Sequence, residues 1–360
     1  MLRSNNRWIV RRPGPEDEAA AKRIARALGL KPLAARLLVL RGIRDAEAAR
    51  AFLEGGPETL RDPFRMKGMR EAAERIRLAL ERGERIRIFG DYDADGVSAT
   101  ALASLLLTEL GADFDHAVPH RTLEGYGLRM PAVEAAAEAG VRLILTVDNG
   151  VSASEAIARA GELGIDVVVT DHHEPPPELP RAAAIVNPKQ PGCPYPFKGL
   201  AGVGVAFKLA HALLGRPPLE WAELAAIGTI ADLMPLQDEN RFIVRHGLGL
   251  MRRTGRPGIR ALAAKCGVEP AALTAESVAF GMAPRINAAG RMKHAEPAIR
   301  LLLTGDEAEA EACAAELDAL NRERQRLVDA IAAEAEAAWS DRVRAAEAAG
   351  GDRPRVIVAA

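Results

Sequence analysis

The sequence predicts an α/β fold: a mainly parallel sheet with flanking helices, followed by a helical region and a long connector helix. Three observations support this prediction. Strand-like apolar runs alternate with Ala/Leu-rich helical stretches between residues 85 and 214, which is the pattern of βαβ units. From residue 220 on, helical periodicity replaces this alternation. Residues 306–349 contain neither proline nor glycine, which permits one extended helix.

The first 83 residues precede the alternating region and are predicted to be mostly helical. Apolar residues recur at helical spacing over 16–29, 33–40 and 45–53. Glycines and prolines within 55–63 predict a loop, and a further helix is expected over 68–82.

The alternating region is expected to form the sheet. Its predicted strands are residues 85–89, 114–118, 142–147, 166–170 and 183–186. The helices predicted among and after them are residues 96–110, 131–139, 152–163 and 203–214. The proline-rich segment 188–198 predicts a loop that ends the regular alternation.

The remainder of the chain is expected to be helical, over 220–231, 240–252, 258–265, 295–303 and 306–349. Residues 356–358 have the composition of a strand, so we expect the chain to stop at the start of a further domain. The predicted divisions are an N-terminal helical and basic segment (1–60), an α/β core (61–215), a helical part of the same domain (216–304), a connector helix (305–350) and the start of a second domain (351–360).

Composition limits the class of protein. Lys+Arg 21 and Asp+Glu 12 within residues 1–90 give a charge of about +9, and the rest carries about −10. The basic segment predicts either nucleic-acid contact or solvated helix faces. Three scattered cysteines without CxxC spacing argue against a disulfide framework or a zinc ribbon. Without an apolar stretch of membrane-spanning length or a signal peptide, a soluble cytoplasmic protein with no membrane contact is expected.

Four acidic clusters follow predicted strands or helices. They are Asp91, Asp93 and Asp95 in GDYDADG, Asp148 in VDNG, Asp171-His172-His173, and Asp232 in IADLMPL. In parallel sheets, ligands bind beyond the carboxyl ends of the strands, where three of these clusters lie. Carboxylates with an occasional imidazole suit Mg²⁺ or Mn²⁺, and two such ions can hold both oxygens of an in-line phosphoryl displacement. The sequence therefore predicts an enzyme that hydrolyses phosphate esters with two divalent metal ions.

GDYDADG also resembles part of an EF-hand loop. That loop needs a bidentate Glu at position 12, where this chain has Leu102, and a helix rather than a strand before it. Three carboxylates within five residues repel one another unless a cation neutralises them, which favours a metal site. Because neighbouring side chains of a strand point to opposite sides, we expect only one of His172 and His173 to face the metals. The other would touch substrate phosphate or orient a ligand.

The ordered motifs GDYDADG, VDNG, DHH and ADLMPL resemble those of the DHH phosphoesterase superfamily. Within it, PHRTLEGYGL (119–128), LAGVGVAFKL (200–209) and APRINAAGRM (283–292) are similar to segments of RecJ-type exonucleases, and the resemblance covers about residues 60–350. The resemblance implies catalytic roles for Asp91 and His173. Asp91 would be a further metal ligand or would orient the attacking water. Asp148 would bridge the two ions. The metal ligands it implies are Asp93, Asp95, Asp148, His172 and Asp232.

One position departs from many superfamily members. They have a histidine four residues before the first shared aspartate, which is Asp93 here, and this chain has Phe89. Asp91 or a water is expected to fill that place around the first ion.

The resemblance also implies residues that bind phosphate or DNA. Tyr126 could stack on a base or be a turn aromatic. The amides of the helix that Gly202 and Gly204 open could bind phosphate, or these glycines could allow close helix packing. They do not complete a GxGxxG pattern, so a nucleotide cofactor is not expected. The other candidates are the arginines Arg121, Arg285 and Arg291, which with Asn287 would hold phosphate. For each arginine the alternative is an ordinary place on the surface or at a helix end.

The function that the resemblance implies is hydrolysis of single-stranded DNA from the 5′ end to 5′-mononucleotides, in DNA repair and recombination, with Mn²⁺ or Mg²⁺. It also implies a single-strand-binding protein and a recombination helicase as partners, and a DHHA1-like domain beginning within residues 351–360. One alternative is another DHH phosphodiesterase, acting on short oligoribonucleotides, cyclic dinucleotides or pyrophosphate; the extended N-terminal region and RINAAGRM disfavour it. A degenerate, non-catalytic replisome subunit is disfavoured by the intact acidic clusters.

Overall fold

The computed structural model describes residues 13–121 and 123–348 of the chain. They divide into two compact units. The smaller unit combines the described part of Met1–Arg61 with Leu236–Phe242, and the larger unit contains Asp62–Pro235 and the chain from Ile243 on. The predicted strand at 356–358 and the predicted domain start at 351–360 lie outside the described residues.

The larger unit is built on a five-stranded sheet of order β2-β1-β3-β4-β5. All four pairings are parallel, so the carboxyl ends of the strands lie along one edge. The register places the last residue of β1, Phe89, beside Ala117 of β2 and Thr146 of β3. The strands are β1 (Ile86–Phe89), β2 (Phe114–Ala117), β3 (Leu143–Val147), β4 (Asp166–Thr170) and β5 (Ala184–Val186).

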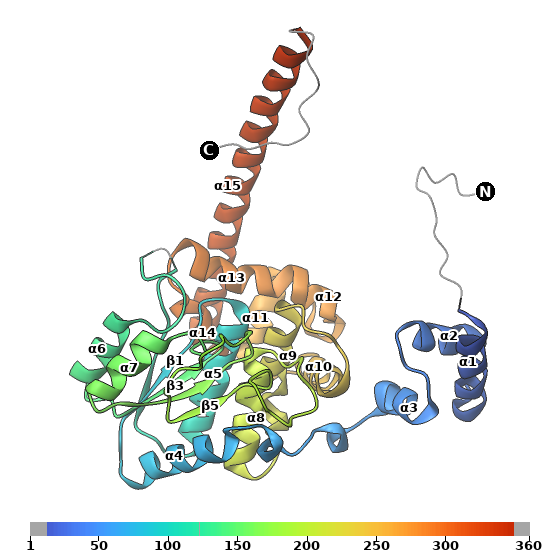
Figure 1. Cartoon of the computed structure of the whole chain (residues 1–360). Coiled ribbons are helices and arrows are strands. Elements are labelled where there is room, and N and C mark those ends of the chain that lie inside the picture. The colour runs from blue at the N-terminus through green and yellow to red at the C-terminus, as the bar shows by residue number, and fades with distance from the viewer. Residues whose placement is uncertain (1–12, 122, 349–360) are drawn as a thin grey trace. The chain divides into compact units, whose positions relative to one another are not determined.

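Helices cover both faces of the sheet, as Figure 1 shows. On one face, α4 (Met69–Glu81), α5 (Ala94–Glu109) and α8 (Gly202–Leu214) contact the strands. On the other, α6 (Met130–Glu138) and α7 (Ser154–Glu162) pack on an apolar layer. That layer contains Phe89, Val133, Ile144, Ile157 and Val169. The two faces account for the near-continuous apolar runs of the central strands, because strands covered on both sides bury every residue.

The helix α5 is buried on nearly all sides, because α8 and α9 (Ala222–Ala231) pack against it in addition to the sheet. Its sequence is correspondingly apolar around the whole circumference. The turn before α5 carries GDYDADG, and the last residue of α9 precedes Asp232. Packing of α5 against α8 and α9 therefore brings three motif-bearing helix ends to the same place.

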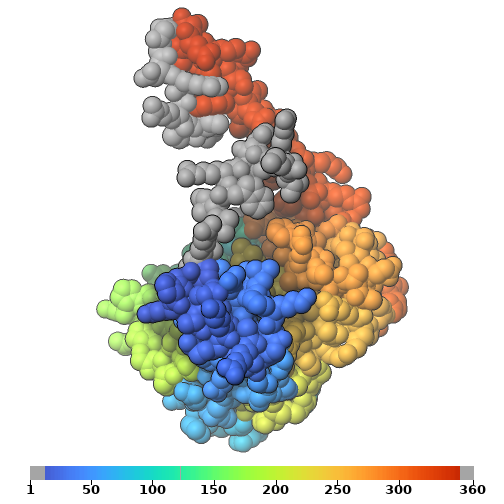
Figure 2. All heavy atoms as spheres, turned by 90° about the vertical axis from the view of Figure 1, so that its right-hand side faces the viewer, coloured from blue at the N-terminus to red at the C-terminus, as the bar shows by residue number. Residues whose placement is uncertain are grey.

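The rest of the larger unit is helical. Its long last helix, α15 (Glu307–Ala348), buries residues mainly between Ala310 and Asn321, with Val343 the exception, and then extends away from the neighbouring helices (Figures 1 and 2). The other elements are η2 (Pro63–Arg65), η3 (Leu219–Trp221), α10 (Asp238–Met251, which begins in the smaller unit), α11 (Pro257–Lys265), η4 (Pro270–Ala272), α12 (Ala275–Ser277), the π-helical η5 (Val278–Met282), α13 (Ala283–Met292) and α14 (Glu296–Leu303).

The smaller unit contains α1 (Pro15–Leu28), α2 (Pro32–Leu40), α3 (Ala46–Glu54) and the short η1 (Pro57–Thr59). Ile24, Ala35, Val39 and Ala49 form its apolar core. The side chain of Asp45 caps α3 by accepting a hydrogen bond from the amide of Ala48.

The predicted fold class is confirmed: a parallel sheet with helices on both faces, a helical region and a long final helix. The segment 275–292, for which no helix is predicted, forms α12, η5 and α13. Among the described residues, no helix is long and apolar enough to cross a membrane.

Candidate metal centre and phosphate-binding residues

The acidic clusters meet at the carboxyl edge of the sheet. Asp148 directly follows β3, and its amide continues the ladder by donating to Thr170 O at 3.0 Å. Asp171 does the same after β4, donating to Val186 O at 3.0 Å. Asp91 follows β1, and Asp232 ends α9. The structure thus brings together all four clusters that the sequence singled out.

The GDYDADG turn is held by its own carboxylates. Oδ1 of Asp93 accepts the amides of Asp95 and Gly96, at 2.9 and 3.0 Å, and thereby caps α5. The carboxylate of Asp95 caps a different helix, because it accepts the amides of Gly202 and Val203 at 2.7 and 2.9 Å at the start of α8. Asp95 is therefore fully buried between α5 and α8.

Asp148 has a left-handed backbone, with φ 63°, which is uncommon outside glycine. The next residue stabilises this turn: the side-chain amide of Asn149 donates to Phe89 O at 3.0 Å and to Val147 O at 2.9 Å. Thr146 Oγ1 donates to Asn149 O at 2.8 Å. These bonds direct the buried carboxylate of Asp148 toward the start of α8, where a Cβ on Gly202 would lie 2.2 Å from Asp148 Oδ1.

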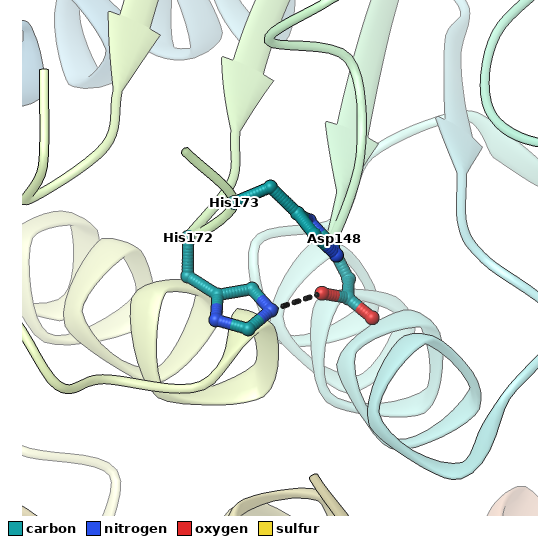
Figure 3. A group of neighbouring side chains, drawn as sticks. All are labelled: Asp148, His172 and His173. Carbon is teal, nitrogen blue, oxygen red and sulfur yellow. Dashed lines mark ion pairs between the residues drawn. The ribbon is translucent and has the colours of Figure 1, made fainter. Parts of the chain in front are cut away.

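The two histidines lie together rather than on opposite sides of a strand. Their ring centroids are 4.5 Å apart. The alternation of a strand does not apply to them, because β4 ends at Thr170. The buried carboxylate of Asp171 instead shapes the turn: its Oδ1 accepts the amides of His172 and His173 and lies 2.7 Å from His173 Nδ1. In Figure 3 the imidazole of His172 points at Asp148, with 3.1 Å between Nε2 and Oδ1.

Three overlapping groups of side chains in the described part of the chain are spaced to hold metal ions, each with its ligand atoms within 4.8 Å of one another. Asp148 and His172 each belong to two of them, so the groups form one continuous centre. The groups are Asp91/Asp93/Asp148, Asp148/His172/His173 and Asp95/His172/Asp232.

Two further observations fit bound cations. Oδ1 of Asp91 and Oδ1 of Asp148 are buried, and within residues 13–121 and 123–348 neither accepts a hydrogen bond, although His172 Nε2 lies 3.1 Å from the Asp148 oxygen. Buried carboxylate oxygens without a donor are costly, so they are the atoms that a cation would satisfy. The donor set of carboxylates and neutral imidazole is the one that Mg²⁺ and Mn²⁺ take.

The electrostatics of the metal-free centre point the same way. Burial, with the charge of Asp93, raises the pKa of Asp91 to about 7. Burial and neighbouring carboxylates also raise the pKa of Asp232 and bring the pKa of Asp95 and Asp148 well above the ordinary value. These shifts record how strongly the folded chain resists this concentration of negative charge without a cation.

The two histidines differ in charge. Burial, together with the neighbouring positive charge of His173, lowers the pKa of His172 to about 4, so its imidazole is neutral and able to ligate. The hydrogen bond to Asp171 raises the pKa of His173. Although burial alone would raise the pKa of Asp171, its bonds from His173 bring it below the ordinary value. His172 is therefore neutral and able to ligate, whereas the hydrogen bond to Asp171 favours the protonated form of His173.

Phe89, which stands where many superfamily members have histidine, offers no ligand atom. Its side chain is buried in the apolar layer under α6 and α7. Asp91 groups with Asp93 and Asp148 instead.

Two of the candidate phosphate-binding residues lie beside the centre. The hydroxyl of Tyr126 is 3.2 Å from His173 Nδ1, and its ring meets that of Tyr92 edge to face. The guanidinium of Arg121 lies over the ring of Tyr92, 5.0 Å from its centroid. Arg291 is exposed near the end of α13, and its charge acts on the Tyr92 hydroxyl.

The structure does not bring Arg285 to this centre. Nε of Arg285 bonds Asp318 Oδ1 at 3.0 Å, and its two terminal nitrogens donate to Gly281 O and Lys265 O, each at 2.9 Å. All three nitrogens are thus used within the helical region. The expectation that Arg285 holds phosphate is wrong in this structure, because α13 turns Arg285 toward α15.

Asn287 and the two glycines also act within the fold. Asn287 Oδ1 accepts the amide of Ala94 at 2.7 Å and so supports the GDYDADG turn. The amide of Gly202 donates to Asp95 Oδ2 at 2.7 Å instead of lying free for a phosphate, and a Cβ at Gly202 would meet the carboxylate of Asp148 rather than a neighbouring helix. A Cβ on Gly204 would meet only Leu200, at 3.3 Å.

Three residues of the centre have no role in the sequence-based prediction: Asp171, which lies in one of the predicted clusters, Asn149 and Tyr92. Asn149 within VDNG carries a usable signal, since an amide after a left-handed aspartate suggests a turn that bonds its own backbone. Tyr92 has no such signal, because its partners come from segments far along the chain.

Known proteins are similar to this chain in sequence and in fold. The DHH family, N-terminal domain, matches residues 85–229. The chain is 50% identical over 359 residues to the single-stranded-DNA-specific exonuclease RecJ of Bacillus subtilis, covering all of this chain and 44% of that protein. It therefore spans about half the length of that relative.

Two solved structures are similar to this chain in fold and in sequence. The crystal structure of RecJ in complex with Mn²⁺ from Thermus thermophilus has a TM-score of 0.75 and 41% identity, over 87% of this chain and 45% of that one. A crystal structure of exonuclease RecJ bound to manganese has a TM-score of 0.69 and 45% identity, over 74% of this chain and 68% of that one. The chain belongs to the RecJ family of DHH proteins.

Proposed function

We propose that this chain carries the catalytic centre of a metal-dependent exonuclease, which hydrolyses single-stranded DNA from the 5′ end to 5′-mononucleotides in DNA repair and recombination. The observation that carries the proposal is the continuous set of three ligand groups that share Asp148 and His172. Relatives named as single-stranded-DNA-specific exonucleases support the choice of substrate.

Asp148 is proposed as the ligand between two ions, because it alone belongs both to the group with Asp91 and Asp93 and to a group with His172. Asp95 and Asp232, which group with His172, would complete the set of metal ligands. Mn²⁺ or Mg²⁺ would lower the pKa of a bound water and stabilise charge on the phosphate.

The chain's own groups would then orient the reaction. Asp91, with a pKa of about 7 in the metal-free protein, is placed to bind an ion or to accept a proton from the attacking water. His173 is held by Asp171 and Tyr126 with its pKa raised, so its positive charge would contact the phosphate. Arg121 and Arg291 would hold DNA phosphates, and Tyr126 would meet a base.

A cytoplasmic location is proposed with this function, together with a single-strand-binding protein and a recombination helicase as partners. These follow from the family and not from a surface of this chain.

The test is a degradation assay with purified protein and Mn²⁺. A single strand labelled at its 5′ end should release labelled mononucleotide at once, whereas the same strand labelled at its 3′ end should shorten gradually. Blunt duplex, single-stranded RNA and Asp148→Asn protein are the controls. Shortening from the 3′ end, or equal cleavage of the RNA, would contradict the proposal.

A further inference from the structure

Tyr92 lies in the middle of the GDYDADG turn, between Asp91 and Asp93. Its ring is partly buried and carries the guanidinium of Arg121 at 5.0 Å from the centroid. The ring of Tyr126 meets it edge to face, with 6.4 Å between centroids and 81° between planes. Tyr92 is therefore the common contact of two residues from the segment that joins β2 to α6.

The backbone of Tyr92 is in contact with a different element, the helix α13. A Cβ at Gly290 would lie 2.3 Å from Tyr92 O and 2.9 Å from Tyr92 Cβ, so only glycine permits this approach. Two residues further along the turn, Ala94 donates its amide to Asn287 Oδ1 of the same helix. The backbone and Cβ of Tyr92 are thus held against α13, which fixes where its ring begins.

Arg121, by contrast, is an exposed side chain on a connecting segment. Across the described residues, no carboxylate forms an ion pair with it; its guanidinium lies over the Tyr92 ring, and its charge acts on Asp91 from a distance. An aromatic face orients a guanidinium without neutralising it, so the positive charge stays available for an anion.

We propose that Tyr92 is a positioning residue, which holds Arg121 over the acidic turn so that it can bind a phosphate of the single-stranded DNA substrate. The inference rests on the proposed function and adds one step to it: Tyr92 acts on DNA through Arg121, not through the metal ions beside it.

The test compares Tyr92→Leu, which removes the ring, with Tyr92→Phe, which keeps it. For a 5′-phosphorylated oligothymidylate with Mn²⁺, Tyr92→Leu should raise KM about two- to fivefold, the weight of one cation–π contact, with kcat nearly unchanged. Tyr92→Phe should stay close to wild type. Stabilisation against heat by Mn²⁺ should be the same in all three proteins.

A double-mutant cycle with Arg121→Ala decides whether Tyr92 acts through Arg121. In the Arg121→Ala protein, Tyr92→Leu should raise KM no further. An equal effect of Tyr92→Leu with and without Arg121, or a Tyr92→Phe protein as impaired as Tyr92→Leu, would overturn the inference. So would loss of the Mn²⁺ stabilisation in Tyr92→Leu, because Tyr92 would then support the metal centre.

The cycle can be repeated for affinity, by fluorescence anisotropy of a labelled single strand with Ca²⁺ replacing Mn²⁺. This arm separates the two proposals. A wild-type protein that binds the strand in Ca²⁺ but does not degrade it in Mn²⁺ contradicts the proposed function, whereas the coupling between Tyr92 and Arg121 is still measured.

Discussion

Oδ1 of Asp148 would lie 2.2 Å from a Cβ placed on Gly202, so the first residue of α8 packs directly on the carboxylate at the middle of the metal centre. Gly204, two residues further along, would place its Cβ no closer than 3.3 Å to any atom outside its neighbours, the nearest being Leu200. These two glycines form a matched pair, because both lie in the first turn of α8 and only one touches a ligand.

Gly202→Ala is expected to displace Asp148 and to weaken Mn²⁺ binding severely, because the added Cβ and the carboxylate of Asp148 cannot occupy the same space. Gly204→Ala should bind Mn²⁺ as the wild type does, and its stability should change by less than about 1 kcal/mol, since alanine favours a helix but here crowds Leu200 slightly. Mn²⁺ titration followed by calorimetry measures both. Equal affinities in the two variants would show that the approach of Gly202 to Asp148 does not matter for the ions.

The metal-free protein should lose stability as pH rises. The folded-state pKa of Asp91 is about 7, against an ordinary value of 3.8, so the folded chain binds a proton that the unfolded chain releases between these values. The stabilising contribution is complete below about pH 3.8 and is lost as pH rises through 7, by on the order of 1 kcal/mol per pH unit. The lowered pKa of His172 acts in the opposite direction below pH 6.5, but equally in an Asp91→Asn variant.

The difference in free energy of unfolding between wild type and Asp91→Asn therefore isolates this term. Measured by urea unfolding in EDTA from pH 4.5 to 7.5, it should shift steadily in favour of the variant as pH rises. A difference independent of pH would mean that Asp91 is not desolvated in the metal-free protein.

Arg285 and Arg291 should behave differently although both belong to APRINAAGRM. Arg285→Ala removes a bond to Asp318 and leaves two carbonyl groups without a donor, so it should cost about 2 kcal/mol of stability and leave KM for DNA unchanged. Arg291→Ala should leave stability within about 0.5 kcal/mol and raise KM, because the side chain is exposed.

Thermal unfolding and KM for a single strand, measured on the same two preparations, check this pair. An Arg285→Ala protein of wild-type stability with a raised KM would show that Arg285 binds DNA after all.

The sequence predicts the parts of this protein that depend on local pattern. The strands β1, β3 and β4 lie within one residue of their predicted bounds, because buried parallel strands are continuous apolar runs. The acidic clusters are predictable for a related reason: each follows such a run, so the sheet brings them to one edge.

The parts that the sequence did not predict depend on distant partners. The role of Arg285 is set by Asp318, 33 residues further on in α15. Tyr92 and Arg121, which are in contact, lie on two different loops that follow strands of the sheet. The orientation of His172 and His173 is set by Asp171 and not by the alternation of a strand. The helix α13 was missed because its glycine and proline disfavour a helix locally, whereas packing on the GDYDADG turn and on α15 stabilises it.

Asp148→Ala should abolish hydrolysis of single-stranded DNA, because one carboxylate is lost to both proposed ions at once. Stability in metal-free buffer should be unchanged or higher, since repulsion from Asp95 and Asp93 is relieved. A degradation assay and urea unfolding in EDTA measure the two effects. A large loss of stability would mean that Asp148 supports the fold rather than the ions.

The central claim is that Asp148 joins two metal ions in one centre, and the stoichiometry of Mn²⁺ binding tests it most directly. Titration of the metal-free protein, followed by calorimetry with an electron-paramagnetic-resonance count of free Mn²⁺, should give two ions per chain for the wild type. The Asp148→Ala protein should lose high-affinity binding of both ions together, and not of one alone. A wild type that binds a single ion, or an Asp148→Ala protein that still binds two with unchanged affinity, would contradict the account.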